Sequence, residues 1–314
     1  MPWRQVLDLF DVLDSPSADG AAAAAVLRAA GVEDVAVTQA RTDVGHTDFV
    51  RATIPGYGGR SSGGRSPTLG VIGRLGGLGA RPARIGFVSD GDGALTALAV
   101  AAKLGSMCKA GDRLPGDVIV TTHVCPAAPT LPHDPVPFMS SPVDMATMNS
   151  REVDEAMEAI LSVDTTRGNR VCNHTGFAIS PTVRQGWVLR VSEDLLDLQQ
   201  QVTGQLPVVL PITMQDITPY GNGVYHLNSI LQPATATAAP VVGVALTAEV
   251  AVAGSGTGAT NLASVEQAAR FCIEAAKSYG ADSLRFCDDE EFGRLVMLYG
   301  SMTQLQTPGD RNPR

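Results

Sequence analysis

From Thr68 onward, short apolar runs alternate with longer segments of helical pattern, and this alternation constrains the fold more than any other feature of the sequence. Strands that alternate with helices form a parallel sheet, because each helix returns the chain to the same end of the sheet. We therefore expect an α/β fold with a central mixed, mainly parallel sheet flanked by helices. The expected strands of this part are Leu69–Ile72, Ile85–Val88, Asp117–Thr122, Leu161–Asp164 and Val241–Leu246.

The length of the chain fits one large domain or two modest ones, and we expect residues 1–314 to form a single domain. Aromatic residues make up only 5% of the chain, and the small residues that replace them suit helices packed closely on parallel strands. Helices are predicted at Trp3–Leu13, Gly20–Ala30, Asp90–Met107, Arg151–Ile160, Glu193–Val202 and Ser264–Lys277, with a closing helix around residues 292–299. Further strands are predicted at Val35–Thr38, Asp48–Ile54, Phe177–Ile179, Trp187–Val191 and Val208–Thr213.

A proline-rich connection is predicted at residues 124–143. Proline lacks a backbone donor and fixes φ, so its repeated occurrence excludes both a helix and a central strand. We expect an ordered loop that covers the functional site as a lid or reaches a neighbouring subunit, with Phe138 and Met139 as its anchors. The prolines concerned are Pro126, Pro129, Pro132, Pro135, Pro137 and Pro142.

Charge and hydropathy argue against nucleic-acid and membrane partners. The chain has 23 Lys and Arg against 32 Asp and Glu, whereas phosphate binding needs clustered cations. It contains no run of eighteen apolar residues, and Met1–Phe10 lacks the apolar core of a signal peptide. The five cysteines form no CxxC pair and predict neither a disulfide framework nor a thiolate zinc site. We expect a cytoplasmic homo-oligomer that acts on a small molecule.

Four predicted strands end on polar side chains that can carry chemistry, namely Asp90, His123, Asp164 and Asp216. In open α/β sheets, ligands bind beyond the carboxyl ends of the strands. Each residue also has a structural interpretation: Asp90 or Asp92 as a helix cap, Asp164 and Asp216 in turns, and His123 as a buried neutral imidazole. Because crowded carboxylates repel, their convergence predicts a neutralising cation or arginine among them.

Other polar residues supply weaker evidence. His46 lies in the sequence GHTD, where a metal ligand can stand beside an orienting carboxylate, although a loop histidine at a strand start is the commoner interpretation. Tyr220, Asn222 and His226 belong to a segment rich in Gly and Asn that can line a pocket. The glycine-rich residues 254–258 form either a plain loop or a cradle of backbone amides for an anion.

Five long motifs resemble the family called domain of unknown function 1177, from Trp3 to about Gln306. The family is uncharacterised, so the resemblance implies no reaction. The motifs are SPTLGVIGRLGGLGARP, LPGDVIVTTHVCP, SVDTTRGNRV, NHTGFAISPTV and PITMQDITPYGNGVYHLNSILQPATAT.

More distantly, the order of elements resembles the zinc aminopeptidase and carboxypeptidase scaffold, a phosphorylase/hydrolase-like three-layer sandwich with two metals at strand ends. Asp90 in SDGDGA matches the bridging aspartate of that scaffold, and Asp164 in SVD matches a later one. The other positions depart from it: Arg74 stands in the His-x-Asp position, His123 in the Glu-Glu position, and residues 254–261 contain no histidine. The resemblance thus implies at most one metal, or an Arg74 that supplies the missing positive charge.

These observations lead to the hypothesis of a metal-dependent hydrolase that cleaves an amide or peptide-like bond in a small anionic substrate. One divalent metal, zinc or manganese, would activate a water molecule. The metal ligands would be Asp90, His123, Asp164 and His46. The general base would be Asp216 or Asp92, because no Glu stands at the expected position, and the substrate would contact Arg74, Tyr220, Asn222 and His226. Two alternatives are a binding protein without catalysis or metal, and a metal-free lyase or isomerase using Arg74 and acid–base residues.

Overall fold

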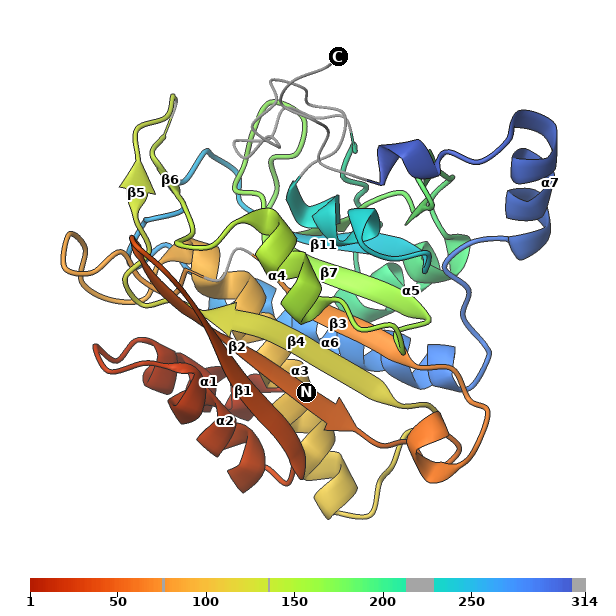
Figure 1. Cartoon of the computed structure of the whole chain (residues 1–314), viewed down its shortest axis with the longest axis horizontal. Coiled ribbons are helices and arrows are strands. Elements are labelled where there is room, and N and C mark those ends of the chain that lie inside the picture. The colour runs from red at the N-terminus through yellow and green to blue at the C-terminus, as the bar shows by residue number, and fades with distance from the viewer. Residues whose placement is uncertain (75–76, 135, 213–228, 307–314) are drawn as a thin grey trace.

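The computed structural model describes residues 1–74, 77–134, 136–212 and 229–306. Its strands form a nine-stranded sheet and a separate two-stranded pair (Figure 1). The large sheet has the order β1 (Asp34–Thr42), β2 (Gly45–Ile54), β4 (Val118–Val124), β3 (Leu69–Gly73), β7 (Ala159–Thr165), β11 (Val241–Thr247), β9 (Val183–Arg184) and β10 (Trp187–Val188), with β8 (Gly176–Ile179) also paired to β11.

The central strands β4, β3, β7 and β11 are parallel to one another. They are apolar along most of their length and buried on both faces, as expected for strands covered by helices on each side. The outer strands pair antiparallel. The predicted mixed sheet with parallel central strands and flanking helices is therefore confirmed. All four carboxyl ends of the central strands lie at the same edge, which we call the carboxyl edge.

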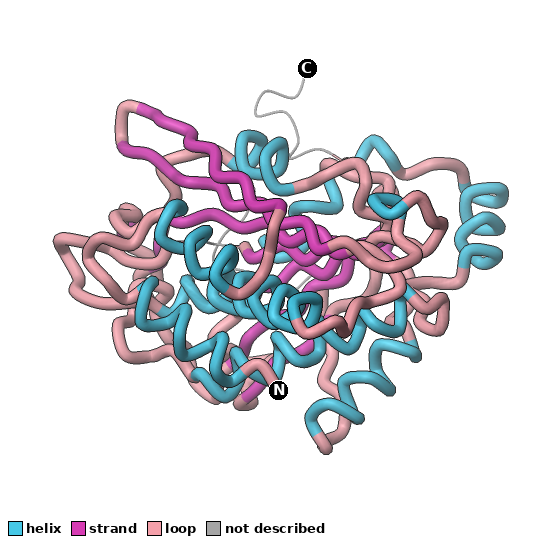
Figure 2. Tube along the Cα trace, turned by 90° about the horizontal axis from the view of Figure 1, so that it is seen from below, coloured by secondary structure: helices cyan, strands magenta, loops and turns pink. Residues whose placement is uncertain are grey.

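A thick helical layer covers one face of the sheet (Figure 2). Its central member, α3, packs against β3, β4 and β7 as well as against other helices. A Cβ atom on Gly93 would lie 2.6 Å from the carbonyl oxygen of Arg74 and 2.7 Å from that of Val163, so the start of α3 abuts the ends of β3 and β7. The layer consists of α1 (Trp3–Leu13), α2 (Gly20–Ala29), α3 (Asp92–Lys109), α5 (Glu193–Thr203) and α6 (Leu262–Gly280).

The opposite face carries a thinner layer formed by α4 (Met145–Glu152) and the 3-10 helix η3 (Ser229–Thr235). Beneath it lies a smaller apolar cluster that includes Ile72, Ile119 and Ile160. Helix α7 (Asp289–Tyr299) stands at the periphery and buries Phe292 (Figure 1). No helix within the described ranges combines the length and apolar character that crossing a bilayer requires.

Three predicted elements differ in the structure. Ile85–Val88 is not a strand, because Gly86 has a φ of 103° and this left-handed turn interrupts the extended backbone. Arg151–Ile160 is not a helix: α4 starts earlier and ends at Glu152, and Val153 is extended. Val208–Thr213 forms no strand over its described residues, where only Val209 bridges to Ile179.

The proline-rich stretch contains the short strands β5 (Thr130–Leu131) and β6 (Phe138–Met139), which pair antiparallel. Met139 is buried in a small cluster with Ala80, Val88, Cys125 and Ala128. The stretch therefore packs on the segment that follows β3. Its function as a lid or subunit contact stays a prediction.

Candidate functional site

Three ionisable side chains form a row across neighbouring strands at the carboxyl edge. Gly73 of β3 lies opposite Thr122 of β4 and Val163 of β7, so the next residues, His123, Arg74 and Asp164, come at the same level. The backbone N–H of Arg74 donates to the carbonyl of Val163 at 2.7 Å, which extends the ladder by one residue. Side chains alternate between the faces of a sheet, so this row shares the face of Ile72, Ile119 and Ile160, under α4 and η3. Each of the three residues is 1% exposed.

Glu152, the last residue of α4, binds two members of this row. Its Oε2 lies 2.5 Å from Nη1 of Arg74, and its Oε1 contacts Nδ1 of His123. The hydroxyl of Thr121 donates to the carbonyl of Glu152 at 2.8 Å, which ties the end of α4 to β4. Glu152 thus joins Arg74 and His123 into a fully buried network, which we call the Glu152 network.

The protonation of Glu152 follows from these contacts. Burial alone would raise the pKa of its carboxyl, but His123 and Arg74 oppose this effect and hold the pKa below its ordinary value. Glu152 is therefore a carboxylate at neutral pH, and the Nδ1–H of His123 donates to it. A neutral imidazole in this tautomer carries its lone pair on Nε2.

A second ion pair lies where α3 begins. Asp92, the first residue of α3, contacts the guanidinium of Arg167, which follows β7, and both side chains are buried. Burial raises the pKa of Asp92 to about 6, while Arg167 and the hydroxyl of Thr260 limit the rise. A carboxyl group with this pKa can take up and release a proton near neutral pH. We call this group the Asp92 pair.

Asp90 and Ser89 attach the start of α3 to the glycine-rich loop that follows β11. They belong to the 3-10 helix η2 (Ser89–Gly91), and the backbone N–H of Asp90 donates to the carbonyl of Gly254 at 3.0 Å. A Cβ atom on residue 254 would lie 2.1 Å from a carboxylate oxygen of Asp90, so only glycine allows this approach. Thr165 of β7 donates through its hydroxyl to the carbonyl of Ser89 at 3.1 Å. The Asp92 pair therefore lies beside the ends of β3 and β7 on the face covered by α3, whereas the Glu152 network lies on the opposite face, under α4 and η3.

Two of the predicted metal ligands, His46 and His123, have different surroundings. Within the described ranges, no group of three or more His, Cys, Asp and Glu side chains is arranged to hold a metal ion. His46 lies exposed near the start of β2, and Nδ1 of His123 is engaged by Glu152. A metal held by Asp90, His123, Asp164 and His46 stays a prediction. Asp216, Tyr220, Asn222 and His226 lie outside the described residues.

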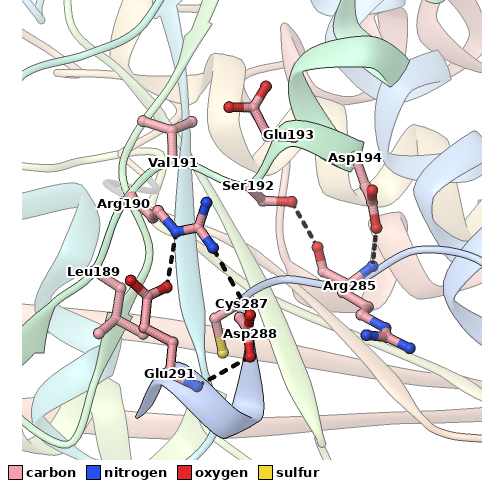
Figure 3. A pocket seen from close by; sticks show the side chains of 10 residues that line it. All are labelled: Leu189, Arg190, Val191, Ser192, Glu193, Asp194, Arg285, Cys287, Asp288 and Glu291. Carbon is pink, nitrogen blue, oxygen red and sulfur yellow. Dashed lines mark hydrogen bonds and ion pairs between the residues drawn. The ribbon is translucent and has the colours of Figure 1, made fainter. Parts of the chain in front are cut away.

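A surface hollow of about 180 Å³ lies away from the central strands, between the starts of α5 and α7 (Figure 3). Arg190 Nε lies 2.7 Å from Glu291 Oε2, and the carboxylate of Asp194 accepts from the backbone N–H of Arg285 at 2.7 Å. These contacts tie the two helix starts together across the hollow. Its polar groups thus have structural partners, and we do not assign it as the functional site.

Glu152 and Arg167 were not among the residues proposed from the sequence. Arg167 belongs to the motif SVDTTRGNRV, and its position soon after a strand-end aspartate was a usable signal. Glu152 had no comparable signal, because it falls at the end of a helix that follows a proline-rich stretch. Arg74, expected to supply positive charge at the strand ends or to contact the substrate, contacts Glu152.

Comparison with known proteins places the chain in a family. The sequence model of the family described as "Protein of unknown function (DUF1177)" matches residues 38–309, and the chain belongs to this family. No curated protein shows significant similarity to the chain.

Proposed function

We propose that this DUF1177 protein is an enzyme that transfers protons on a small molecule bound at the carboxyl edge of β3, β4 and β7. One observation carries the proposal: six ionisable side chains are buried at this edge of the sheet, on its two faces. Burying such groups costs free energy, and their concentration at strand ends is typical of active sites. The six are Arg74, Asp92, His123, Glu152, Asp164 and Arg167. The first five residues are at most 1% exposed, and the side chain of Arg167 is 3% exposed.

The carboxyl groups of Asp92 and Glu152 suit different tasks. Asp92, with a pKa of about 6, is the acid–base group, because it exchanges its proton near neutral pH. Glu152 stays ionised and fixes the ring and tautomer of His123, so Glu152 is a positioning residue. His123 is the second acid–base group. This division supports a lyase or isomerase reaction, which requires proton transfer.

A deuterium-exchange experiment tests the proposal. The full chain is incubated in D2O with a panel of small oxo acids, hydroxy acids and amino acids, and loss of C–H signals is followed by NMR. Wild-type protein is expected to catalyse exchange of at least one class, with a rate that depends on a group of pKa near 6. Asp92→Asn should abolish exchange, and Arg190→Gln in the surface hollow should not change it. The proposal fails if Asp92→Asn, folded by circular dichroism, exchanges as fast as wild type.

A metal-dependent hydrolase is the second candidate function, and one observation favours it. Glu152 contacts Nδ1 of His123, which is how a carboxylate orients a histidine that binds metal through its other nitrogen. The described residues provide no complete ligand set, so we derive no step through a metal. Elemental analysis of protein purified without chelator separates the candidates, since a hydrolase of this kind should retain about one equivalent of zinc or manganese.

A further inference from the structure

We infer that the protein forms a symmetric dimer in which strand β1 pairs antiparallel with β1 of a second copy. β1 is the first strand of the sheet, and no described strand pairs with its outer side (Figures 1 and 2). It is nine residues long, and most of its residues are exposed. The opposite end of the sheet is formed by the two-residue strands β9 and β10, which offer little backbone for pairing.

β1 lacks three features by which proteins often protect an exposed edge strand, namely lysine, proline and a bulge that interrupts the ladder. β1 has the sequence DVAVTQART, without lysine or proline, and it pairs with β2 residue by residue from Asp34 to Thr42. Its outer side is therefore a regular row of backbone donors and acceptors.

The turn of the hairpin shows which residues direct these groups outward. Asp43 and Val44 form a two-residue loop, and Thr42 pairs with Gly45. In such hairpins the closing pair is hydrogen-bonded, so every second residue from Thr42 faces β2 and the residues between them face outward. The outward residues are Val35, Val37, Gln39 and Arg41. A contact supports this assignment, because the guanidinium of Arg28 donates to the carbonyl of Val35 at 2.9 Å. That oxygen has a second lone pair for a strand partner.

Charge complementarity selects one register. In a symmetric pair, outward residues must lie opposite outward residues. With Val37 on the twofold axis, Val35 lies opposite Gln39 of the second copy, and Glu33 lies opposite Arg41 of the second copy. Shifting the axis to Ala36 or Thr38 would place Arg41 opposite Gly31 or Val35 instead. Glu33 and Arg41 are exposed, and neither forms an ion pair with a described residue of its own chain. The Val37 register therefore forms two new ion pairs and covers Val37, which is 37% exposed.

Charge reversal tests this register directly. The full chain is studied by sedimentation velocity, and wild type is expected to be a dimer. Glu33→Arg and Arg41→Glu each place a pair of like charges at both ends of the interface. Each variant should weaken dimerisation on the order of tenfold or more. Mixing the two variants should restore a dimer, because positions 33 and 41 then again bring one basic and one acidic side chain together at both ends of the mixed interface. The double variant should also dimerise alone.

Val37→Lys provides an independent arm, because it places two ammonium groups at the twofold axis, and it should also yield a monomer. All variants lie on the surface, and an unchanged circular dichroism spectrum verifies the fold. A monomeric wild type would overturn the inference. So would a dimer that resists both reversals and Val37→Lys, since it would then assemble through another surface.

Discussion

The Glu152 network and the Asp92 pair lie at the same edge of the sheet, yet the pKa of the Glu152 carboxyl is lowered and that of the Asp92 carboxyl is raised. Both carboxyls are fully buried, and burial raises the pKa of each. Glu152 has two cationic or proton-donating partners, Arg74 and His123, which more than offset burial. Asp92 has one guanidinium partner and a hydroxyl, and burial prevails.

The comparison shows that the partners of a buried carboxyl, rather than its depth, decide whether its pKa is raised or lowered. One group keeps its charge and organises its neighbours, whereas the other changes charge near neutral pH. Pairs of groups whose environments separate their pKa values in this way are how an active site obtains distinct roles from similar side chains. Three changes to the chain test whether the two groups differ as described.

The largest effect is expected for Glu152→Gln. The amide cannot compensate the charge of Arg74, which is left buried, and the unfolding free energy should fall by about 3–5 kcal/mol. Urea unfolding at neutral pH measures the change. Glu291→Gln is the matched control, because its pair with Arg190 is exposed and should contribute less than about 1 kcal/mol. An equal loss of unfolding free energy in both variants would show that the Glu152–Arg74 pair contributes no more than an exposed ion pair.

Asp92→Asn should change how stability depends on pH. The folded state binds the Asp92 proton more tightly than the unfolded chain, so wild-type stability falls as pH rises from about 3.8 to about 6. The rise in pKa of about two units corresponds to about 3 kcal/mol. The Asn variant lacks this fall, and its stability relative to wild type should improve by that amount between pH 4 and 7.

Glu152 gives the opposite dependence, which sharpens the test. Its lowered pKa contributes stability that is present above its ordinary value of 4.5 and is lost as pH falls further. Chemical unfolding across this range separates the two groups. A stability difference between wild type and Asp92→Asn that is independent of pH would contradict the assignment of Asp92 as the group that titrates near 6.

The smallest effect concerns the helices that carry the two carboxyls. Asp144 caps α4, since its carboxylate accepts from the backbone N–H of Thr147 at 2.7 Å, whereas no side chain caps α3 at Gly91. Asp144→Ala should lower the unfolding free energy by about 1 kcal/mol. Ser150→Ala, at an exposed position later in α4, is the control and should change stability by less than half of that. If Asp144→Ala costs no more than Ser150→Ala, α4 is held by the Glu152 network and not by its cap.

The parallel core could be read from the sequence because its signals are local. Four continuous apolar runs are flanked by helical patterns, and each run predicts a buried strand by itself. They lie around Leu69, Val118, Leu161 and Val241. The failures have local causes as well. The apolar run at Ile85–Val88 contains a glycine with positive φ, and periodicity alone does not register this. The helix predicted at Arg151–Ile160 begins earlier, because Asp144, at the end of the proline-rich stretch, caps its start.

The candidate site could be predicted only in part. The positions of Arg74, Asp92, His123 and Asp164 at strand ends followed from the rule that ligands gather at the carboxyl edge. Their pairing did not follow, because Glu152 stands 78 residues from Arg74 in the sequence, and no local pattern relates them. Nothing in the printed sequence distinguishes a carboxylate that meets two cationic or donor groups from one that meets a single guanidinium.

The placement of α4 has a kinetic consequence. The connection from β4 to β7 passes over β3. Glu152 therefore contacts Arg74 and His123 only after β3 and β4 have paired and α4 has packed on them. Closing such long segments is slow, and contacts that need three assembled elements form late. Interactions absent from the folding transition state slow unfolding without accelerating folding. The Glu152 network therefore acts as a latch: its loss should leave the refolding rate nearly unchanged and shorten the lifetime of the native state.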